Sequence, residues 1–230
     1  MTAVLTILVV AAFLTLAGGV VYLWLRLNET SRREALQALA ARRGWALNIS
    51  SEYLGRPGML RLSPRGGPAW TVETRALASL VESAAAGRQA TEYLAEEPRW
   101  PEGILVICPP LPEEFAPQDG GRPFDGPEAR AFLAARLGQS FARSTTGLSA
   151  WPAPEGMALL CTQDPVPRFD PPAMARALDL WGLEAGRRPV VVFGPEGLRL
   201  HLPEGLRRAG QMERFIDLAH ELGRLLTGGV

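Results

Sequence analysis

Residues 3–25 carry no charged side chain, and this uncharged run constrains the chain more than any other feature of its sequence. As an α-helix it would extend about 35 Å, at ~1.5 Å per residue, which is enough to cross the hydrocarbon core of a bilayer. A secretory signal peptide is the alternative, but such peptides begin with a basic segment and have a shorter apolar run. Here the first basic residue, Arg26, follows the run, although the small residues at 17–19 resemble a cleavage site. The sequence therefore predicts a transmembrane anchor over residues 1–27.

The basic residues near this run all lie on its C-terminal side. No arginine precedes residues 3–25, whereas several follow closely. Because positively charged flanks stay in the cytoplasm, this asymmetry predicts a single-pass protein of a bacterial inner membrane, with its N-terminus outside and its C-terminal domain in the cytoplasm. Tyr22 and Trp24 lie at the same end as Arg26, and the three residues are candidate anchors at the level of the lipid headgroups. In that reducing compartment both cysteines are expected to be free thiols.

Small residues recur along one side of the predicted span. Ala11, Thr15 and Gly19 follow one another every four positions, and Gly18 flanks them. Small side chains at this spacing let a second helix approach closely within the lipid. They predict a membrane-protein partner for the span, whose identity the sequence does not give.

A second helical segment is expected after the span, at residues 28–44. Ser31 and Glu34 fit the two positions of an N-terminal capping box, and the juxtamembrane amphipathic helix is either separate from the span or continuous with it. Its apolar stripe consists of Ala35, Leu36, Leu39 and Ala40. The basic residues of this region are Arg32, Arg33, Arg42 and Arg43. They are candidate contacts to anionic lipid headgroups, or they only fix the topology.

Residues 45–230 combine extended and helical patterns, which predicts one cytoplasmic α+β domain with a largely antiparallel sheet and three or four helices. Strands are expected at 45–50, 58–63, 70–74, 89–95, 104–108, 157–161, 190–193 and 198–202. Helices are expected at 127–138, 171–182 and 211–226. The strands cluster early and the helices are interleaved late, unlike the strict alternation of a βαβ chain.

The tripeptide Pro-Glu-Gly recurs in the domain. It occurs at 101–103, 154–156, 195–197 and 203–205. Pro and Gly at this spacing favour type I turns. Two copies are also followed by four apolar residues and a cysteine, Cys108 or Cys161, and then by a proline-rich loop and a helix. One hypothesis is a duplicated strand-loop-helix unit around 100–138 and 151–182, in which neighbouring strands could bring the thiols close together.

No established catalytic template is present in the sequence. It has no Gly-x-Ser-x-Gly elbow, no phosphate-binding Gly-x-x-x-x-Gly-Lys motif and no Gly-x-Gly-x-x-Gly motif after a strand. The cysteines and the two histidines, His201 and His220, lack the close pairing of zinc ligands, so neither a metal nor a cofactor is expected. The basic residues are scattered and equal the acidic ones at 24 each, which argues against nucleic-acid binding.

The sequence thus favours a membrane-anchored accessory or assembly subunit of a membrane protein complex, with no catalytic role. Trp100 and Trp151 each precede a proline in a predicted turn, and they are candidate residues of a partner interface, with burial in the core as the alternative. The alternative function is a membrane-tethered enzyme or small-ligand sensor. Its site would be assembled from distant residues, such as the acids of loop 113–125 together with Arg122.

Overall fold

The computed structural model describes the backbone of residues 2–50, 58–76, 89–117, 121–165, 169–181 and 188–227. Side chains are described in the same ranges except at residues 2–15, 25, 26, 76 and 140. Among the residues described, no helix combines the length and the apolar character needed to cross a membrane. The side chains of three predicted membrane residues, Ala11, Thr15 and Arg26, lie outside the described set.

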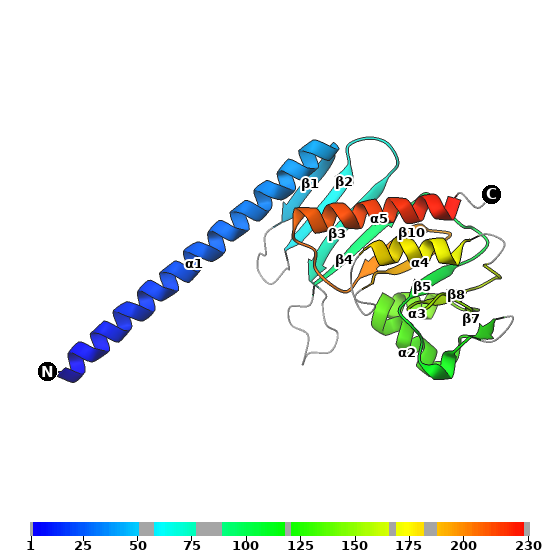
Figure 1. Cartoon of the computed structure of the whole chain (residues 1–230), viewed down its shortest axis with the longest axis horizontal. Helices are drawn as coiled ribbons and strands as arrows, with labels where there is room; N and C mark the ends of the chain where they lie inside the picture. The colour runs from blue at the N-terminus through cyan, green and yellow to red at the C-terminus, as the bar shows by residue number, and fades with distance from the viewer. Residues whose placement is uncertain are drawn as a thin grey trace.

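The chain forms an α+β fold around a ten-stranded sheet, ordered β1-β2-β3-β4-β10-β9-β5-β8-β7-β6 (Figure 1). The strands are β1 (Trp45–Ser50), β2 (Met59–Pro64), β3 (Trp70–Ala76), β4 (Gln89–Ala95), β5 (Leu105–Cys108), β6 (Arg122–Pro123), β7 (Ser149–Trp151), β8 (Ala158–Cys161), β9 (Val190–Gly194) and β10 (Gly197–Leu202). Every pair of neighbouring strands is antiparallel, which confirms the predicted sheet type.

The helices are α1 (Thr2–Arg43), α2 (Gly126–Leu137), α3 (Gln139–Ser144), α4 (Pro171–Leu180) and α5 (Ala209–Thr227), with a short 3-10 helix at Glu113–Phe115. The end of α1, α4 and α5 share one buried cluster with one face of the sheet. Helices α2 and α3 share a second cluster with the opposite face of β9, β5, β8 and β7. Along β2, β3, β4 and β10, by contrast, no described helix covers that second face (Figure 1).

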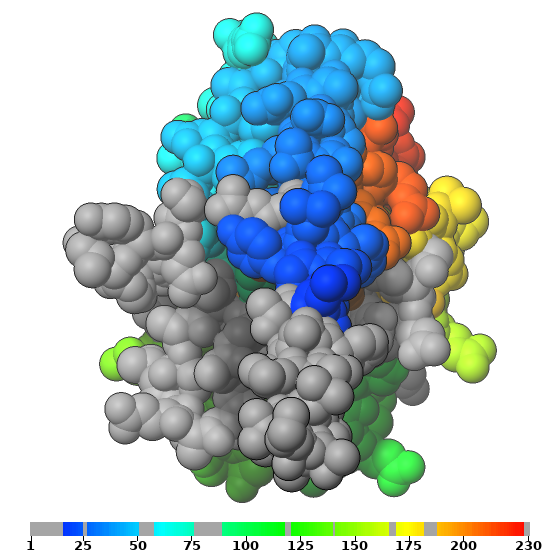
Figure 2. Space-filling model, turned by 90° about the vertical axis from the view of Figure 1, so that its left-hand side faces the viewer, coloured from blue at the N-terminus to red at the C-terminus, as the bar shows by residue number. Residues whose placement is uncertain are grey.

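Helix α1 is one continuous element that joins the predicted span to the juxtamembrane helix. The predicted start at Ser31 is wrong, because the helix passes through this residue without interruption. Near its end Leu36, Leu39 and Ala40 are buried in the main core, as their apolar spacing predicts, whereas Ala35 is exposed. The rest of α1 extends away from the domain (Figure 1). In the view from the N-terminal side of α1, the start of α5 lies beside the C-terminal part of α1 (Figure 2).

The two cysteine-bearing strands are neighbours, but their thiols do not come together. Strands β5 and β8 pair antiparallel, with Cys108 opposite Ala158 and Cys161 opposite Leu105. Cys108 packs in the cluster under α2 and Cys161 in the cluster under α4, so the thiols face opposite sides of the sheet. Both thiols are free and buried. A symmetric duplication would place equivalent residues on the same face, so this arrangement lends the duplication hypothesis no support.

Four short elements were not predicted from the sequence, namely α3, β6, β7 and the 3-10 helix at Glu113–Phe115. Strand β6 has two residues and β7 has three, too few for an alternating pattern to stand out. The predictions for longer strands are confirmed. Strand β4 has the predicted bounds, and β9 and β10 form the predicted hairpin across Pro195 and Glu196. Central strands β5 and β8 are buried at every position, in line with their continuous apolar sequences.

Candidate functional site

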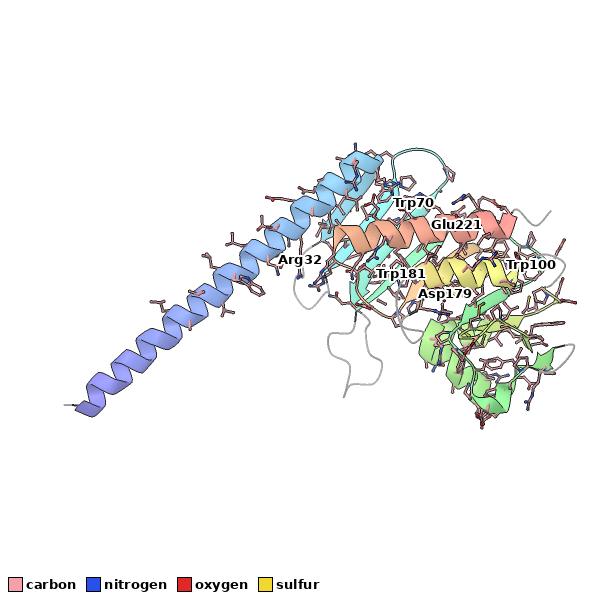
Figure 3. All side chains as sticks on the ribbon, in the orientation of Figure 1. Arg32, Trp70, Trp100, Asp179, Trp181 and Glu221 are labelled. Carbon is pink, nitrogen blue, oxygen red and sulfur yellow. The ribbon has the colours of Figure 1, made fainter. Side chains whose placement is uncertain are left out.

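The projecting part of α1 exposes a belt of large apolar side chains. Its members are Leu16, Val20, Val21, Tyr22, Leu23, Trp24 and Leu27, which are between 56% and 71% exposed. Successive helical residues point about 100° apart, so the consecutive residues 20–24 surround the whole helix. Among the helices and strands that the structure describes, none lies alongside this part of α1 (Figure 3). The predicted anchors Tyr22 and Trp24 belong to this exposed apolar surface.

The predicted small-residue stripe is described only in part. Gly18 and Gly19 lie in α1 and have no heavy atom within 4 Å of an added Cβ, so nothing described in the chain packs against them. The predicted lipid contacts Arg32 and Arg33 lie farther along the helix, and Arg32 is found where α1 reaches the domain (Figure 3). Arg33 donates a hydrogen bond to Glu29, one turn earlier.

Arg42 and Arg43, also predicted as lipid contacts, instead join α1 to α5. Arg42 Nη2 lies 2.9 Å from Glu213 Oε2, and Arg43 Nε lies 2.8 Å from Glu213 Oε1. Arg43 Nη2 also lies 2.8 Å from Asp217 Oδ2. Hydrogen bonds from Arg43 and Arg42 lower the pKa of Glu213. Both guanidinium groups are thus engaged by carboxylates of α5, whereas Arg33 pairs with Glu29 within α1 and lies nearer the predicted span together with Arg32.

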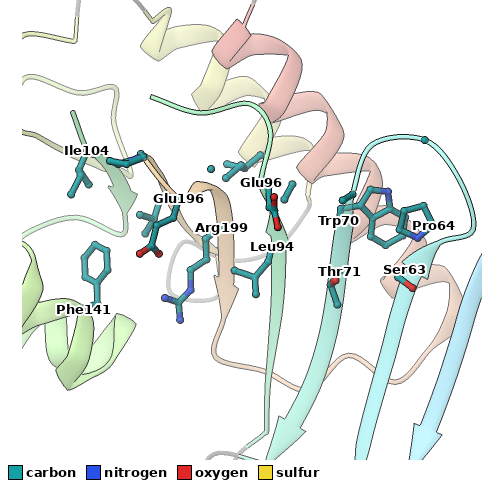
Figure 4. A pocket seen from close by; sticks show the side chains of 18 of the residues that line it. Ser63, Pro64, Trp70, Thr71, Leu94, Glu96, Ile104, Phe141, Glu196 and Arg199 are labelled. Atoms are coloured by element: carbon teal, nitrogen blue, oxygen red, sulfur yellow. The ribbon is translucent and has the colours of Figure 1, made fainter. Parts of the chain in front are cut away.

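The uncovered face of the sheet forms a groove with α2 and α3. We call it the open-face groove; it consists of a hollow of about 880 Å³ beside α3 and a hollow of about 840 Å³ beside α2. Arg199 of β10 lines both hollows, so they meet at this residue. The α3 end is largely apolar: Phe141 and Ile104 lie on one side and Leu94 on the other, with Arg199 and Glu196 between them (Figure 4).

A hydrogen-bonded cluster of charged groups occupies the middle of the groove. Glu92 of β4 accepts hydrogen bonds from Arg199, with Nε 2.9 Å from Oε1, and its Oε1 lies 3.4 Å from His201 Nδ1. Burial by itself raises the pKa of Glu92, but hydrogen bonds from His201 and Arg199 and their charge outweigh it and lower the pKa to about 2. Glu92 is therefore a carboxylate at neutral pH, and its side chain is 17% exposed.

This cluster predicts a pH dependence of stability that Glu92→Gln removes. Between pH 4.5, the usual pKa of the group, and about 2, the unfolded chain binds a proton at Glu92 and the folded chain does not. Glu92 therefore stabilises the fold above this window, and its contribution of up to about 3 kcal/mol disappears as the pH falls through it. Urea unfolding measured at several pH values should show that the free energy of unfolding falls less at acidic pH in Glu92→Gln than in the native chain.

Glu96→Gln is the matched control for this measurement. The Glu96 side chain is 75% exposed and, within the described ranges, forms an ion pair with Arg99, three residues later, so Glu96→Gln should leave the pH dependence of the native chain unchanged. If the free energy of unfolding falls equally with decreasing pH in the native chain and in Glu92→Gln, the lowered pKa of Glu92 is contradicted.

The two tryptophans predicted at a partner interface differ in exposure. Trp100 is only 2% exposed, and its ring packs edge-on to Phe169 at 5.3 Å and stacks on Phe193 at 6.4 Å between ring centroids. The interface prediction is therefore wrong for Trp100, which is a core residue. Trp151 is half-buried, and its ring lies over Gly121, where an added Cβ would approach to 3.0 Å.

Other predicted site residues do not converge. Glu113 and Glu114 of the acidic loop are exposed, Asp119 lies outside the described residues, and Arg122 belongs to β6 at the sheet edge. Within the described ranges, no group of three or more His, Cys, Asp or Glu residues is placed to hold a metal ion. The open-face groove was missed by sequence reasoning, although Glu73, Glu92 and Arg199 alternate with the core residues Val72, Tyr93 and Leu200. This alternation indicates a solvated face but not what lies opposite it.

Comparisons with protein families, with curated protein sequences and with solved structures find no match to the chain.

Proposed function

We propose that the chain is a single-pass protein of a bacterial inner membrane, with its N-terminus outside and its α+β domain in the cytoplasm. The observation that carries this proposal is the uncharged run of residues 3–25, whose C-terminal part forms most of the exposed apolar belt of α1. An all-round apolar helix surface is stable in lipid and unfavourable in water. The arginines that follow the run support the orientation. Arg32 and Arg33 are close enough to the span to contact anionic lipid headgroups.

In this membrane the chain acts as an accessory or assembly subunit without catalytic activity of its own. Its span packs against a helix of a partner protein through Ala11, Thr15, Gly18 and Gly19. Such close packing is favoured in lipid because small residues allow van der Waals contact between helix backbones. The ion pairs from Arg42 and Arg43 to α5 support a fixed connection between the anchor and the domain.

The experiment is co-purification of the C-terminally tagged chain from bacterial membranes, with and without Gly19→Leu. The native chain should stay in membranes washed with alkaline carbonate, its tag should resist protease added outside spheroplasts, and it should retain a partner in mild detergent. Nothing described in the chain lies within 4 Å of a Cβ at Gly19, so Gly19→Leu should leave the domain folded. Because the leucine side chain would hold the two helix backbones apart, partner recovery should fall about tenfold, which corresponds to ~1.4 kcal/mol.

Val21→Leu is the matched control, because Val21 lies about 200° around the helix from Gly19 and is 56% exposed. It should retain the partner. Release of the chain by carbonate argues against the anchor, and equal partner recovery with Gly19→Leu and the native chain argues against the predicted packing surface.

A small-ligand sensor is the second candidate function. It is favoured by the open-face groove, which combines an apolar end with the Glu92, Arg199 and His201 cluster, the combination typical of ligand sites.

A further inference from the structure

A smaller hollow of about 280 Å³ adjoins the α2 end of the open-face groove, and basic side chains dominate its polar lining. Arg136 of α2, Arg188 before β9 and His201 of β10 contribute to it, together with the apolar residues Pro109, Ala135, Val190 and Pro203. None of these lining residues is acidic. The hollow is thus large enough for a small polar group and presents only hydrogen-bond donors or imidazole to it among side chains.

Arg136 is held in place by an aromatic ring, and no described residue accepts a hydrogen bond from it. Its guanidinium carbon lies 3.6 Å from the centroid of the Phe132 ring, one helical turn earlier. Stacking of this kind fixes a guanidinium plane and leaves the N–H groups at its edge available. Among the described residues Arg136 has no carboxylate partner within 4.0 Å. The last turn of α2 therefore presents a cation whose charge is not balanced by a neighbour.

Arg188 is fixed by two acceptors, and a third donor is left over. Its Nη1 donates to the Gly156 carbonyl at 3.1 Å, and its Nη2 donates to Asp179. Its Nε is buried and has no acceptor among the described residues. A buried donor without a partner costs free energy of the order of 1–3 kcal/mol, but this atom has almost no accessible surface, so Arg188 contributes to the hollow through the rest of its guanidinium group.

We propose that this hollow binds a phosphate group. Asp179 balances Arg188, and Arg199 balances Glu92 beside His201, so Arg136 leaves one excess positive charge at the hollow. A tetrahedral phosphate has enough oxygens to accept hydrogen bonds from several separate side chains at once, whereas a carboxylate has two. The phosphate belongs either to a soluble phosphate ester or to a lipid headgroup. This site goes beyond the accessory role and does not depend on a protein partner.

The test measures binding to the full chain in detergent micelles by isothermal titration calorimetry. One arm uses glycerol 3-phosphate, and the other compares micelles doped with phosphatidic acid and with phosphatidylcholine. Saturable binding of glycerol 3-phosphate identifies a soluble ligand, and binding of phosphatidic acid alone identifies a lipid. In whichever arm binds, Arg136→Gln should weaken the affinity at least tenfold, as expected for a lost hydrogen bond between charged groups.

Arg130→Gln is the matched control, since Arg130 is exposed on the same helix and does not line the hollow. It should change the affinity less than twofold. Arg136→Lys, which keeps the charge but not the planar fork, should fall between the two variants, and thermal unfolding checks that all three remain folded. Absence of binding in both arms, or an equal loss in Arg130→Gln and Arg136→Gln, overturns the proposal.

Discussion

Replacement of Leu39 by alanine is expected to lower the free energy of unfolding of the domain by about 2–5 kcal/mol, the cost of removing a buried leucine side chain and leaving a cavity. Leu39 lies near the end of α1, yet it is only 2% exposed and packs in the main core. The measurement is urea unfolding of the full chain in mild detergent, followed by tryptophan fluorescence. Trp45 and Trp70 report on this region, because their rings meet edge-on at 5.3 Å beside the end of α1.

Leu27→Ala supplies the control within the same helix. Leu27 is 62% exposed on the projecting part of α1, so its truncation removes no contact from the core. A change within about 0.5 kcal/mol is expected, as for most surface substitutions. Similar losses in the two variants would show that the end of α1 does not belong to the core of the domain. The expected difference would instead show that the last turns of α1 belong to the core, so a fragment that lacks Leu39 would lose part of its core.

The strands and long helices of the domain could be predicted because each repeats one apolar pattern over several residues. Helix α5 illustrates this: Met212, Phe215, Ile216 and Ala219 follow helical spacing, and all four are fully buried. The order of the strands could not be predicted. Strand β10 lies between β4 and β9, so it pairs with residues more than one hundred positions away, and nothing local to either strand specifies that register.

The errors in the predicted site have the same cause, because local sequence patterns do not identify partners that lie far away along the chain. Arg42 and Arg43 resemble other juxtamembrane arginines in sequence, and their partners Glu213 and Asp217 lie about 170 residues away. Trp100 lies beside a turn in the sequence, but Phe169 and Phe193 enclose it from two distant segments. The open-face groove has the same origin, since α2 and α3 cover only half of one sheet face. Local patterns give the polarity of a surface, whereas the fold alone decides which surfaces meet.

Replacement of Gly197 by alanine should destabilise the domain by about 3–5 kcal/mol, because backbone strain and a steric clash act together. Gly197 begins β10 after the two-residue turn and has a φ of +103°, which side chains rarely allow. An added Cβ would also lie 2.1 Å from the Ala95 carbonyl oxygen and 2.8 Å from the Glu96 carbonyl carbon. Both neighbours are backbone atoms of the chain leaving β4, so the clash can be relieved only by moving β10 away from β4. Urea unfolding of the full chain in mild detergent measures the loss.

Gly67→Ala separates the two causes. Gly67 also has a positive φ, +87°, but no atom lies within 4 Å of its added Cβ. This variant should show the backbone strain alone, roughly 1–3 kcal/mol, because its side chain meets open space. The excess loss in Gly197→Ala then measures the close approach of β10 to β4, the pairing that joins the N-terminal strands to the rest of the sheet. Equal losses would mean that the strands yield easily at this point, and that the floor of the open-face groove is held by the remaining pairs of β4 and β10 instead.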